Sequence, residues 1–278
     1  MVLPIKQTEG EDMGGNGPVR MRPSRVLRKL RAGQIVSCFK LNLDTARAAE
    51  MAAIAGYDCI WSDMEHIATD WSLLESQIWA AKAGDSDVMV RVARGGYSDY
   101  IRPLELDAAG IMVPHIMSLE DAKRVVWMTR FHPVGRRPMD GGNADAAFCN
   151  VPLDEYFEQA NRERFVAIQI EDPEPLDELD EIAALEGIDI IFFGPGDFSQ
   201  GIGAPAEWNH PRILDTRKRI ADACLAHGKF AGVPATVDNI DEIIALGYRF
   251  IGFGADVLGI KGYCDRLMCE FHKREVEE

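Results

Sequence analysis

Apolar residues in this chain gather in short continuous runs that alternate with longer amphipathic segments. The runs lie near Ile35, Cys59, Val88, Ile111, Phe165, Ile188, Phe230 and Phe250. Continuous runs are typical of strands that are buried on both faces of a parallel sheet. Helical patterns follow them, for example at 45–55, 71–83, 119–128, 212–227 and 240–246.

This alternation predicts an α/β fold, and eight strand-then-helix units have the count and size of a (β/α)8 barrel. An open, doubly wound sheet is the alternative, but no glycine-rich dinucleotide loop follows the first strand. We expect residues 23–278 to form this single barrel domain, and residues 1–22, rich in Gly and Pro, to form a flexible arm.

Two segments of the barrel domain depart from the repeating pattern. Residues 25–31 have the pattern of a short basic helix that closes one end of the domain. Residues 131–150 interrupt the rhythm between the fourth and fifth strands and contain three glycines. We expect this second segment to be a loop at the catalytic rim, the barrel edge formed by the carboxyl-terminal ends of the strands.

Two consecutive apolar runs each end in a carboxylate, Glu171 after the fifth run and Asp197 after the sixth. A helical pattern at 173–186 separates the runs, so a right-handed crossover places the two strands side by side. Both acids then project from the same edge and are able to share a hard divalent cation. Two solvated acids at strand ends are the alternative, which the repulsion between unpaired neighbouring charges disfavours.

The second and third strands also carry ionisable groups. The second run ends in a cluster of Asp63, Glu65 and His66, and an imidazole beside carboxylates suits proton transfer near neutral pH. Arg91 lies inside the third run, where a buried guanidinium needs an anion. That anion is either a substrate oxygen or a rim acid such as Glu65. His115, after the fourth run, is either a rim residue or a packing residue, and we favour packing.

Composition narrows the classes of partner. The chain has 30 basic and 45 acidic residues, a net charge of −15, which argues against nucleic acid and anionic membrane surfaces as partners. Small anionic substrates remain compatible, because a local arginine or metal outweighs a distant average. Six cysteines without a Cys-x-x-Cys pair predict reduced thiols of a cytoplasmic protein. No apolar stretch is long enough to span a bilayer.

Five short motifs stand in order on the expected strands: 63–66, 90–91, 111–114, 169–171 and 194–199. In order and spacing they resemble the HpcH/HpaI family of metal-dependent class II pyruvate aldolases, over roughly residues 24–270. The resemblance implies a TIM barrel of the phosphoenolpyruvate/pyruvate type. It also implies cleavage of a 4-hydroxy-2-oxo acid to pyruvate and an aldehyde, with Mg²⁺, Mn²⁺ or Co²⁺ at the rim.

The same resemblance assigns roles to individual residues. It makes Glu171 and Asp197 the metal ligands. It places the substrate against Gln169 and the backbone around Gly196 and Asp197, with Arg91 stabilising the enolate oxygen.

For proton transfer, the resemblance makes His66 the base, acting through water. Counting back from Pro114 places the acid that raises the basicity of this histidine on Glu105. Many family members are homo-oligomers, so we expect a hexamer or trimer in which Asp63 or the 131–150 loop contributes across an interface.

The residues support this chemistry independently of the family resemblance. Breaking a carbon–carbon bond beta to a carbonyl requires removal of a hydroxyl proton and stabilisation of the enolate, which His66 and a cation with Arg91 supply. We expect no lysine at a matching strand end, because Lys229 and Lys261 are poorly placed, so a Schiff base is disfavoured. Ligation by oxygen alone favours Mg²⁺ or Mn²⁺ over Zn²⁺.

The chain also departs from the family pattern. Glu171 is followed by Asp172 and Pro173 where members usually have Thr. Asp172 either tunes the metal or caps the next helix, and we favour the cap because Pro suits the first helical position. The departures leave the aldehyde partner open. Two other functions stay in view: an acyl-CoA lyase of the citryl or malyl type on the same barrel, and a non-catalytic oligomeric binding protein.

Overall fold

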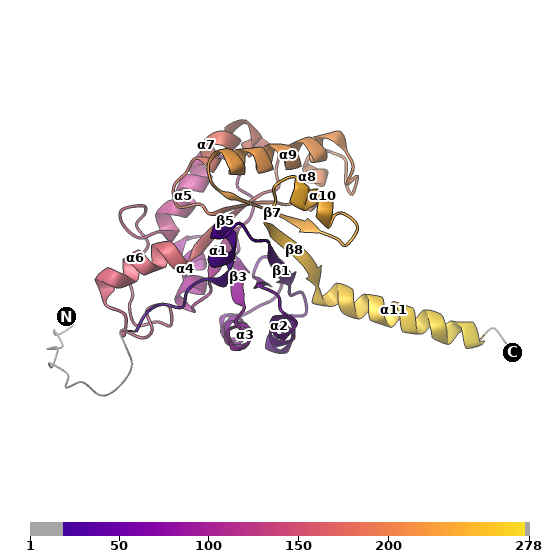
Figure 1. Ribbon diagram of the computed structural model, residues 1–278, viewed down its shortest axis with the longest axis horizontal. Coiled ribbons are helices and arrows are strands. Elements are labelled where there is room, and N and C mark those ends of the chain that lie inside the picture. The colour runs from indigo at the N-terminus through magenta and orange to yellow at the C-terminus, as the bar shows by residue number, and fades with distance from the viewer. Residues whose placement is uncertain (1–18, 276–278) are drawn as a thin grey trace.

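Eight parallel strands pair in the order of the sequence and close into a barrel (Figure 1). The computed structural model describes residues 19–275, and these statements concern that part of the chain. The strands are β1 (Val36–Lys40), β2 (Cys59–Asp63), β3 (Asp87–Arg91), β4 (Gly110–Val113), β5 (Phe165–Ile170), β6 (Ile190–Phe193), β7 (Phe230–Ala235) and β8 (Phe250–Ala255). The predicted (β/α)8 barrel is confirmed.

Helices follow the strands around the barrel. They are α1 (Arg25–Arg31), α2 (Ala46–Ile54), α3 (Trp71–Ala83), α4 (Tyr97–Glu105), α5 (Leu119–Thr129), α6 (Leu153–Glu163), α7 (Leu179–Ala183), α8 (Pro195–Gly201), α9 (Pro211–Ala226), α10 (Ile240–Ala245) and α11 (Asp256–Glu275). The helix expected at 173–186 is shorter, a 3₁₀ turn η1 (Glu174–Glu178) followed by α7. Side-chain oxygens of Thr45, Asp70 and Ser118 cap α2, α3 and α5 by accepting backbone N–H groups.

The side chains alternate between two faces along each strand. On β5, Val166 and Ile168 pack outward against the helices, whereas Phe165 and Ala167 belong to the cluster that fills the barrel interior. The interior is apolar near the amino-terminal ends of the strands. By the same alternation the last inward position of β5 is Gln169, so polar side chains cover the carboxyl-terminal end of the apolar interior.

The amino-terminal end of the barrel is closed by α1, as the sequence predicted. Val26, Leu27 and Leu30 are buried in the interior cluster. The expected arm at 1–22 is only partly testable, because residues 1–18 lie outside the described residues. The rest of it is not an arm: the backbone N–H of Met21 donates to Gln159 Oε1 at 3.0 Å, and Met21 is buried.

The 131–150 segment does not lie at the catalytic rim of its own chain. It follows α5 and leads through α6 into the first residue of β5, so the order of elements places it at the amino-terminal edge of the barrel. Its Asp145 is buried and accepts a 2.6 Å hydrogen bond from Arg164 Nε, just before β5. The loop is therefore fastened to the edge opposite the strand ends that carry the predicted site.

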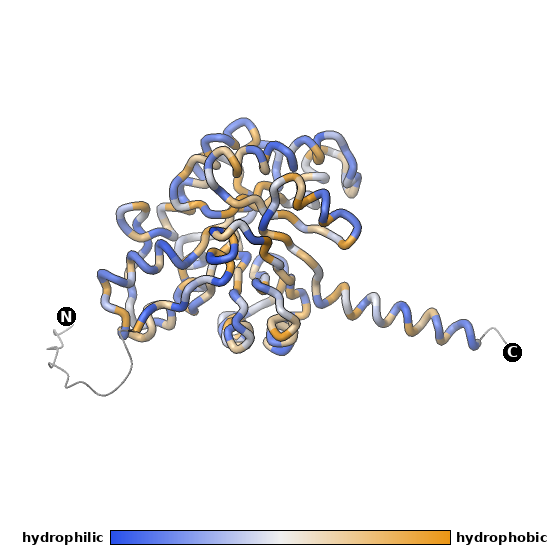
Figure 2. The backbone as a smooth tube through the Cα atoms, viewed as in Figure 1, coloured by the Kyte–Doolittle hydropathy of each residue, from blue (hydrophilic) through white to orange (hydrophobic). Residues whose placement is uncertain are grey.

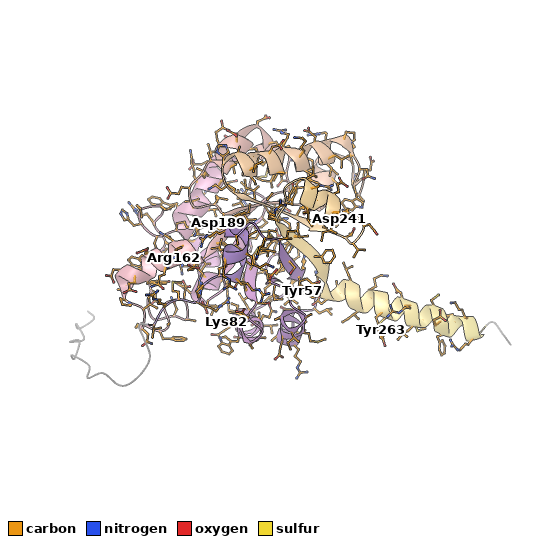
Figure 3. The ribbon with its side chains drawn as sticks, viewed as in Figure 1. Tyr57, Lys82, Arg162, Asp189, Asp241 and Tyr263 are labelled. Atoms are coloured by element: carbon orange, nitrogen blue, oxygen red, sulfur yellow. The ribbon has the colours of Figure 1, made fainter. Side chains whose placement is uncertain are left out.

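The last helix does not cover the barrel. Figure 1 shows α11 projecting away from the body of the molecule, and every side chain from Val257 to Arg274 is exposed. Figure 2 shows apolar and polar residues alternating along it, although it touches little of its own chain. Figure 3 labels Tyr263 on the projecting part and Tyr57 close to its base. Among the described residues, no helix is long and apolar enough to cross a membrane.

Candidate active site

The carboxyl-terminal ends of β2 and β3 bring a buried ion pair to the rim. The strand register places Asp63 opposite Arg91, and Arg91 Nε donates to Asp63 Oδ1 at 3.1 Å. Both side chains are buried, and the guanidinium lies 5.0 Å from the ring centroid of Trp61. Arg91 Nη1 also lies 3.1 Å from Glu65 Oε2. Asp63 and Glu65 therefore hold Arg91 in place, and its guanidinium still has N–H groups that are free to bind a ligand.

Glu65 and His66 stand together just past β2. Glu65 and His66 point their backbone N–H groups at Asp63 Oδ1, at 3.0 and 3.4 Å, which fixes the turn. The imidazole Nε2 of His66 lies 3.4 Å from Glu65 Oε2. The His66 side chain is 57% exposed, so it is accessible to a substrate or a bridging water.

A second group of side chains gathers beyond β4, β5 and β6. Ligand atoms of His115, Glu171 and Asp197 all lie within 4.8 Å of one another. The predicted pair of carboxylates is thus brought together, Glu171 directly after β5 and Asp197 in the first turn of α8. The backbone N–H of His115 donates to Glu171 Oε1 at 2.9 Å and orients that carboxylate.

Gln169 and two glycines shape the space beside Glu171. Gln169 donates from Nε2 to Glu171 Oε2, while its own buried Oε1 has no partner among the described residues. A side chain at Gly194 would lie 2.6 Å from Gln169 Nε2 and 2.7 Å from Glu171 Oε2, so glycine is needed there. A side chain at Gly196 would meet open space, which leaves room for a ligand beside the predicted substrate residues.

The charges at this group suit a cation. Burial raises the pKa of Glu171 to about 7, and the negative charges of Asp197 and Glu65 raise it against the lowering effect of His115. Glu65 Oε2 is a second buried oxygen that accepts no hydrogen bond from the described residues, although it forms an ion pair with Arg91 Nη1 at 3.1 Å. Carboxylate oxygens with unused acceptor capacity and a raised proton affinity form a donor set that fits a divalent metal ion.

The structure differs from two predictions, one about lysines at strand ends and one about the position of Glu105. Lys40 is the last residue of β1, so a lysine does stand at a strand end, and its Nζ lies 3.1 Å from Asp63 Oδ2. Glu105 ends α4, which leads into the amino-terminal end of β4, whereas His66 follows the carboxyl-terminal end of β2. Within one chain, Glu105 and His66 therefore lie at opposite ends of the barrel and do not meet. Burial raises the pKa of Glu105, with Asp140 and Asp145 of the 131–150 loop contributing.

The comparison with known families agrees with this geometry. A model of the family described as "HpcH/HpaI aldolase/citrate lyase" matches residues 37–260. The chain belongs to this family.

Relatives of this HpcH/HpaI chain are similar along nearly their whole length. A 2-keto-3-deoxy-L-rhamnonate aldolase of Escherichia coli (strain K12) is 32% identical, with 87% of this chain and 91% of that protein covered. A 5-keto-4-deoxy-D-glucarate aldolase of Salmonella paratyphi A is 30% identical, with 90% and 98% covered. The crystal structure of an HpcH/HpaI aldolase/citrate lyase family protein from Burkholderia cenocepacia J2315 has a TM-score of 0.83 at 30% identity, with 90% and 99% covered.

Within this HpcH/HpaI barrel, two site residues were missed by the sequence analysis. Asp172 is not a helix cap, because Pro173 holds the N-cap position of η1 and Asp172 Oδ2 instead lies 2.8 Å from His115 Nδ1. His115 is a rim residue and not a packing residue. Strand register was the available signal: Val113 pairs with Ile168, so residues just past β4 and β5 must be neighbours.

Proposed function

We propose that this protein is a class II aldolase that cleaves a 4-hydroxy-2-oxo acid to pyruvate and an aldehyde, and catalyses the reverse condensation. The observation that carries the proposal is the pairing of the His115, Glu171 and Asp197 group with the buried Arg91 at one rim. Membership in the HpcH/HpaI family and relatives named as keto-deoxy acid aldolases support it.

Glu171 and Asp197 are the residues that would hold the cation, which we propose to be Mg²⁺, Mn²⁺ or Co²⁺. A bound divalent ion supplies Lewis acidity and charge stabilisation to an oxo acid. Gln169 Nε2 and the open backbone at Gly196 border the same space and would orient the substrate.

The chain's own residues then divide the work of bond cleavage. His66, exposed beside Glu65, removes the proton of the substrate hydroxyl, directly or through water. The bond between the hydroxyl-bearing carbon and its neighbour breaks, and the electron pair moves toward the carbonyl oxygen. Arg91 stabilises this charge with N–H groups that Asp63 and Glu65 hold in place.

We further propose that the protein is a cytoplasmic homo-oligomer, a hexamer or trimer. The lining of a groove of about 510 Å³ includes Phe39, Met51, Tyr57 and Ile260, of which Met51, on α2, is exposed. This groove and the projecting α11 give two apolar surfaces for neighbouring copies. A neighbour's amino-terminal edge would also supply Glu105 to His66. All six cysteines are free thiols, which supports a cytoplasmic location because disulfides are rare there.

The acyl-CoA lyase alternative is less well supported at this rim. Asp63 engages both Lys40 and Arg91 through ion pairs. A cation already held by a carboxylate is less available to the phosphates of a nucleotide thioester, which favours a small oxo acid. The ion pair also disfavours Lys40 as a Schiff-base nucleophile, because the carboxylate of Asp63 engages the amine that would have to attack the substrate carbonyl.

The test is exchange of the pyruvate methyl protons for deuterium, followed by NMR with purified protein and Mn²⁺ or Mg²⁺. We expect exchange that stops on chelation and in Glu171→Gln, because removal of a methyl proton requires stabilisation of the enolate. Borohydride added with pyruvate should not inactivate the protein. Metal-independent exchange with borohydride inactivation, lost in Lys40→Met, would replace the proposal by a Schiff-base mechanism, and absence of exchange with any metal would reject an aldolase.

A further inference from the structure

His115 is a rim residue with an unusual backbone conformation. Its backbone has φ of 50°, in the left-handed region that non-glycine residues seldom adopt. This conformation lets its N–H donate to Glu171 Oε1, while its ring stays near the same carboxylate, with Nδ1 at 3.7 Å from Oε1. The backbone and the side chain of His115 thus both lie close to the carboxylate of Glu171, a predicted metal ligand.

Asp172 fixes the state of the imidazole. Its Oδ2 lies 2.8 Å from His115 Nδ1, and a hydrogen bond to a carboxylate requires the hydrogen on Nδ1. In the neutral ring, Nε2 then carries the free lone pair. The contact of Nε2 with Glu65 Oε1, at 3.8 Å, is too long for a hydrogen bond. A carboxylate bound to one ring nitrogen is the usual outer partner of a histidine that binds a metal through the other.

Resting on the proposed metal site, we propose that His115 is a third protein ligand of the ion, with Asp172 as the partner that orients it. Ligand atoms of His115, Glu171 and Asp197 lie within 4.8 Å of one another, a span that one ion can bridge. The ring nitrogen 3.7 Å from Glu171 Oε1 is Nδ1, so the ring would turn about its bond with Asp172 to present Nε2 to the ion. The site then has mixed nitrogen and oxygen ligands, in place of the all-oxygen set expected from the sequence.

This ligand set changes which ions the protein prefers. Imidazole raises affinity for later first-row ions and contributes little for Mg²⁺, which prefers oxygen. Co²⁺ should therefore bind the wild type more tightly than Mg²⁺, and His115→Asn should remove much of this difference. Asn tolerates the left-handed backbone better than most residues, so this variant retains the N–H that orients Glu171.

The test uses the metal alone, without substrate. With Mn²⁺ bound, pulsed EPR should show coupling to a ligand nitrogen in the wild type and in the control His66→Gln, and no such coupling in His115→Asn. Titration calorimetry should show Co²⁺ dissociation constants at least ~10-fold higher in His115→Asn and ~10- to 100-fold higher in Asp172→Asn, which keeps the nitrogen coupling. Circular dichroism checks that each variant is folded.

The outcomes separate this inference from the proposed function. Mn²⁺ that binds the wild type, requires Glu171 and shows no nitrogen coupling overturns the role of His115 and leaves the aldolase site standing. Nitrogen coupling that disappears in His66→Gln and persists in His115→Asn also overturns it. A wild-type protein that binds neither Mg²⁺, Mn²⁺ nor Co²⁺ overturns both the proposal that His115 is a ligand and the proposal of a metal-dependent aldolase.

Discussion

At the scale of single residues, Asp63 is the buried acid that binds Lys40, Arg91 and the backbone N–H of Glu65 at the rim. Burial alone would raise its pKa, but the Arg91 guanidinium, Lys40 and the N–H of Glu65 together lower the pKa to about 2. The carboxylate therefore stabilises the fold through its charged form. It also holds Lys40 and Arg91 in place at the rim through ion pairs.

We expect this stabilisation to depend on pH with a definite sign. The folded-state pKa of Asp63, about 2, lies below its ordinary value of 3.8, so the stabilising charge is present above pH 4 and lost as pH falls through 2. The contribution is about 2 kcal/mol at pH 7, and roughly half of it is lost by pH 3. Urea unfolding of the wild type and Asp63→Asn at pH 7, 5 and 3 measures it.

The stability difference between these proteins should shrink by about 1 kcal/mol between pH 5 and pH 3. Asp238→Asn, which removes an exposed carboxylate, controls for the change in net charge. A difference between wild type and Asp63→Asn that stays constant over this range would show that Asp63 does not act through its charge.

Much of the candidate site was predictable from residues at strand ends. Glu171 and Asp197 end consecutive buried runs, and parallel strands must bring such ends to one edge. His115 and Asp172 were not predicted, because their meeting depends on strand register and on a positive φ, neither of which apolar periodicity encodes. Lys40 was missed because the apolar run near Ile35 did not show that the first strand extends to residue 40.

At the scale of elements, a buried charge network fastens the 131–150 loop to the barrel. Asp145 accepts hydrogen bonds from Arg164 Nε at 2.6 Å, Arg137 Nη2 at 3.0 Å and the Tyr156 hydroxyl at 2.9 Å. Arg164 also pairs with Asp107 just before β4. The sequence indicated a loop here but placed it at the wrong edge, because the strand rhythm alone does not show that α5 has already returned the chain to the amino-terminal edge.

Asp145→Asn should destabilise the protein by about 3–5 kcal/mol, because it leaves two buried guanidinium groups with too little negative charge. Urea unfolding measures the loss. Asp140→Asn is the matched control in the same loop: Asp140 is exposed, and an asparagine oxygen can still accept the bond from the N–H of Gly142. Equal stability of the Asp145 and Asp140 variants would show that the network does not hold the loop.

At the scale of the whole molecule, the projecting helix α11 is the feature that the proposed oligomer explains. The last helix leaves the body at Asp256, whose carboxylate accepts the N–H groups of Asn42 and Leu43 at 2.7 and 3.0 Å and sets its direction. Beyond this anchor α11 exposes Leu258, at 64%, and Phe271, at 55%. The eighth strand-then-helix unit implies a helix after β8, but the count of units does not say whether that helix packs against its own barrel or against a neighbour.

Ending the chain at Gly259 should therefore dissociate the assembly and leave a folded barrel. The deleted segment, 260–278, includes described side chains that are all exposed through Arg274, so its loss removes little packing within one chain. Light scattering after size-exclusion chromatography should give an oligomer for the full chain and a monomer for the truncated one. Leu225→Glu, at an exposed apolar position on α9, should keep the full mass. Metal binding should survive truncation, because its ligands come from one chain, whereas activity should fall if Glu105 reaches His66 only from a neighbour. An oligomer of unchanged mass after truncation would show that α11 does not hold the copies together.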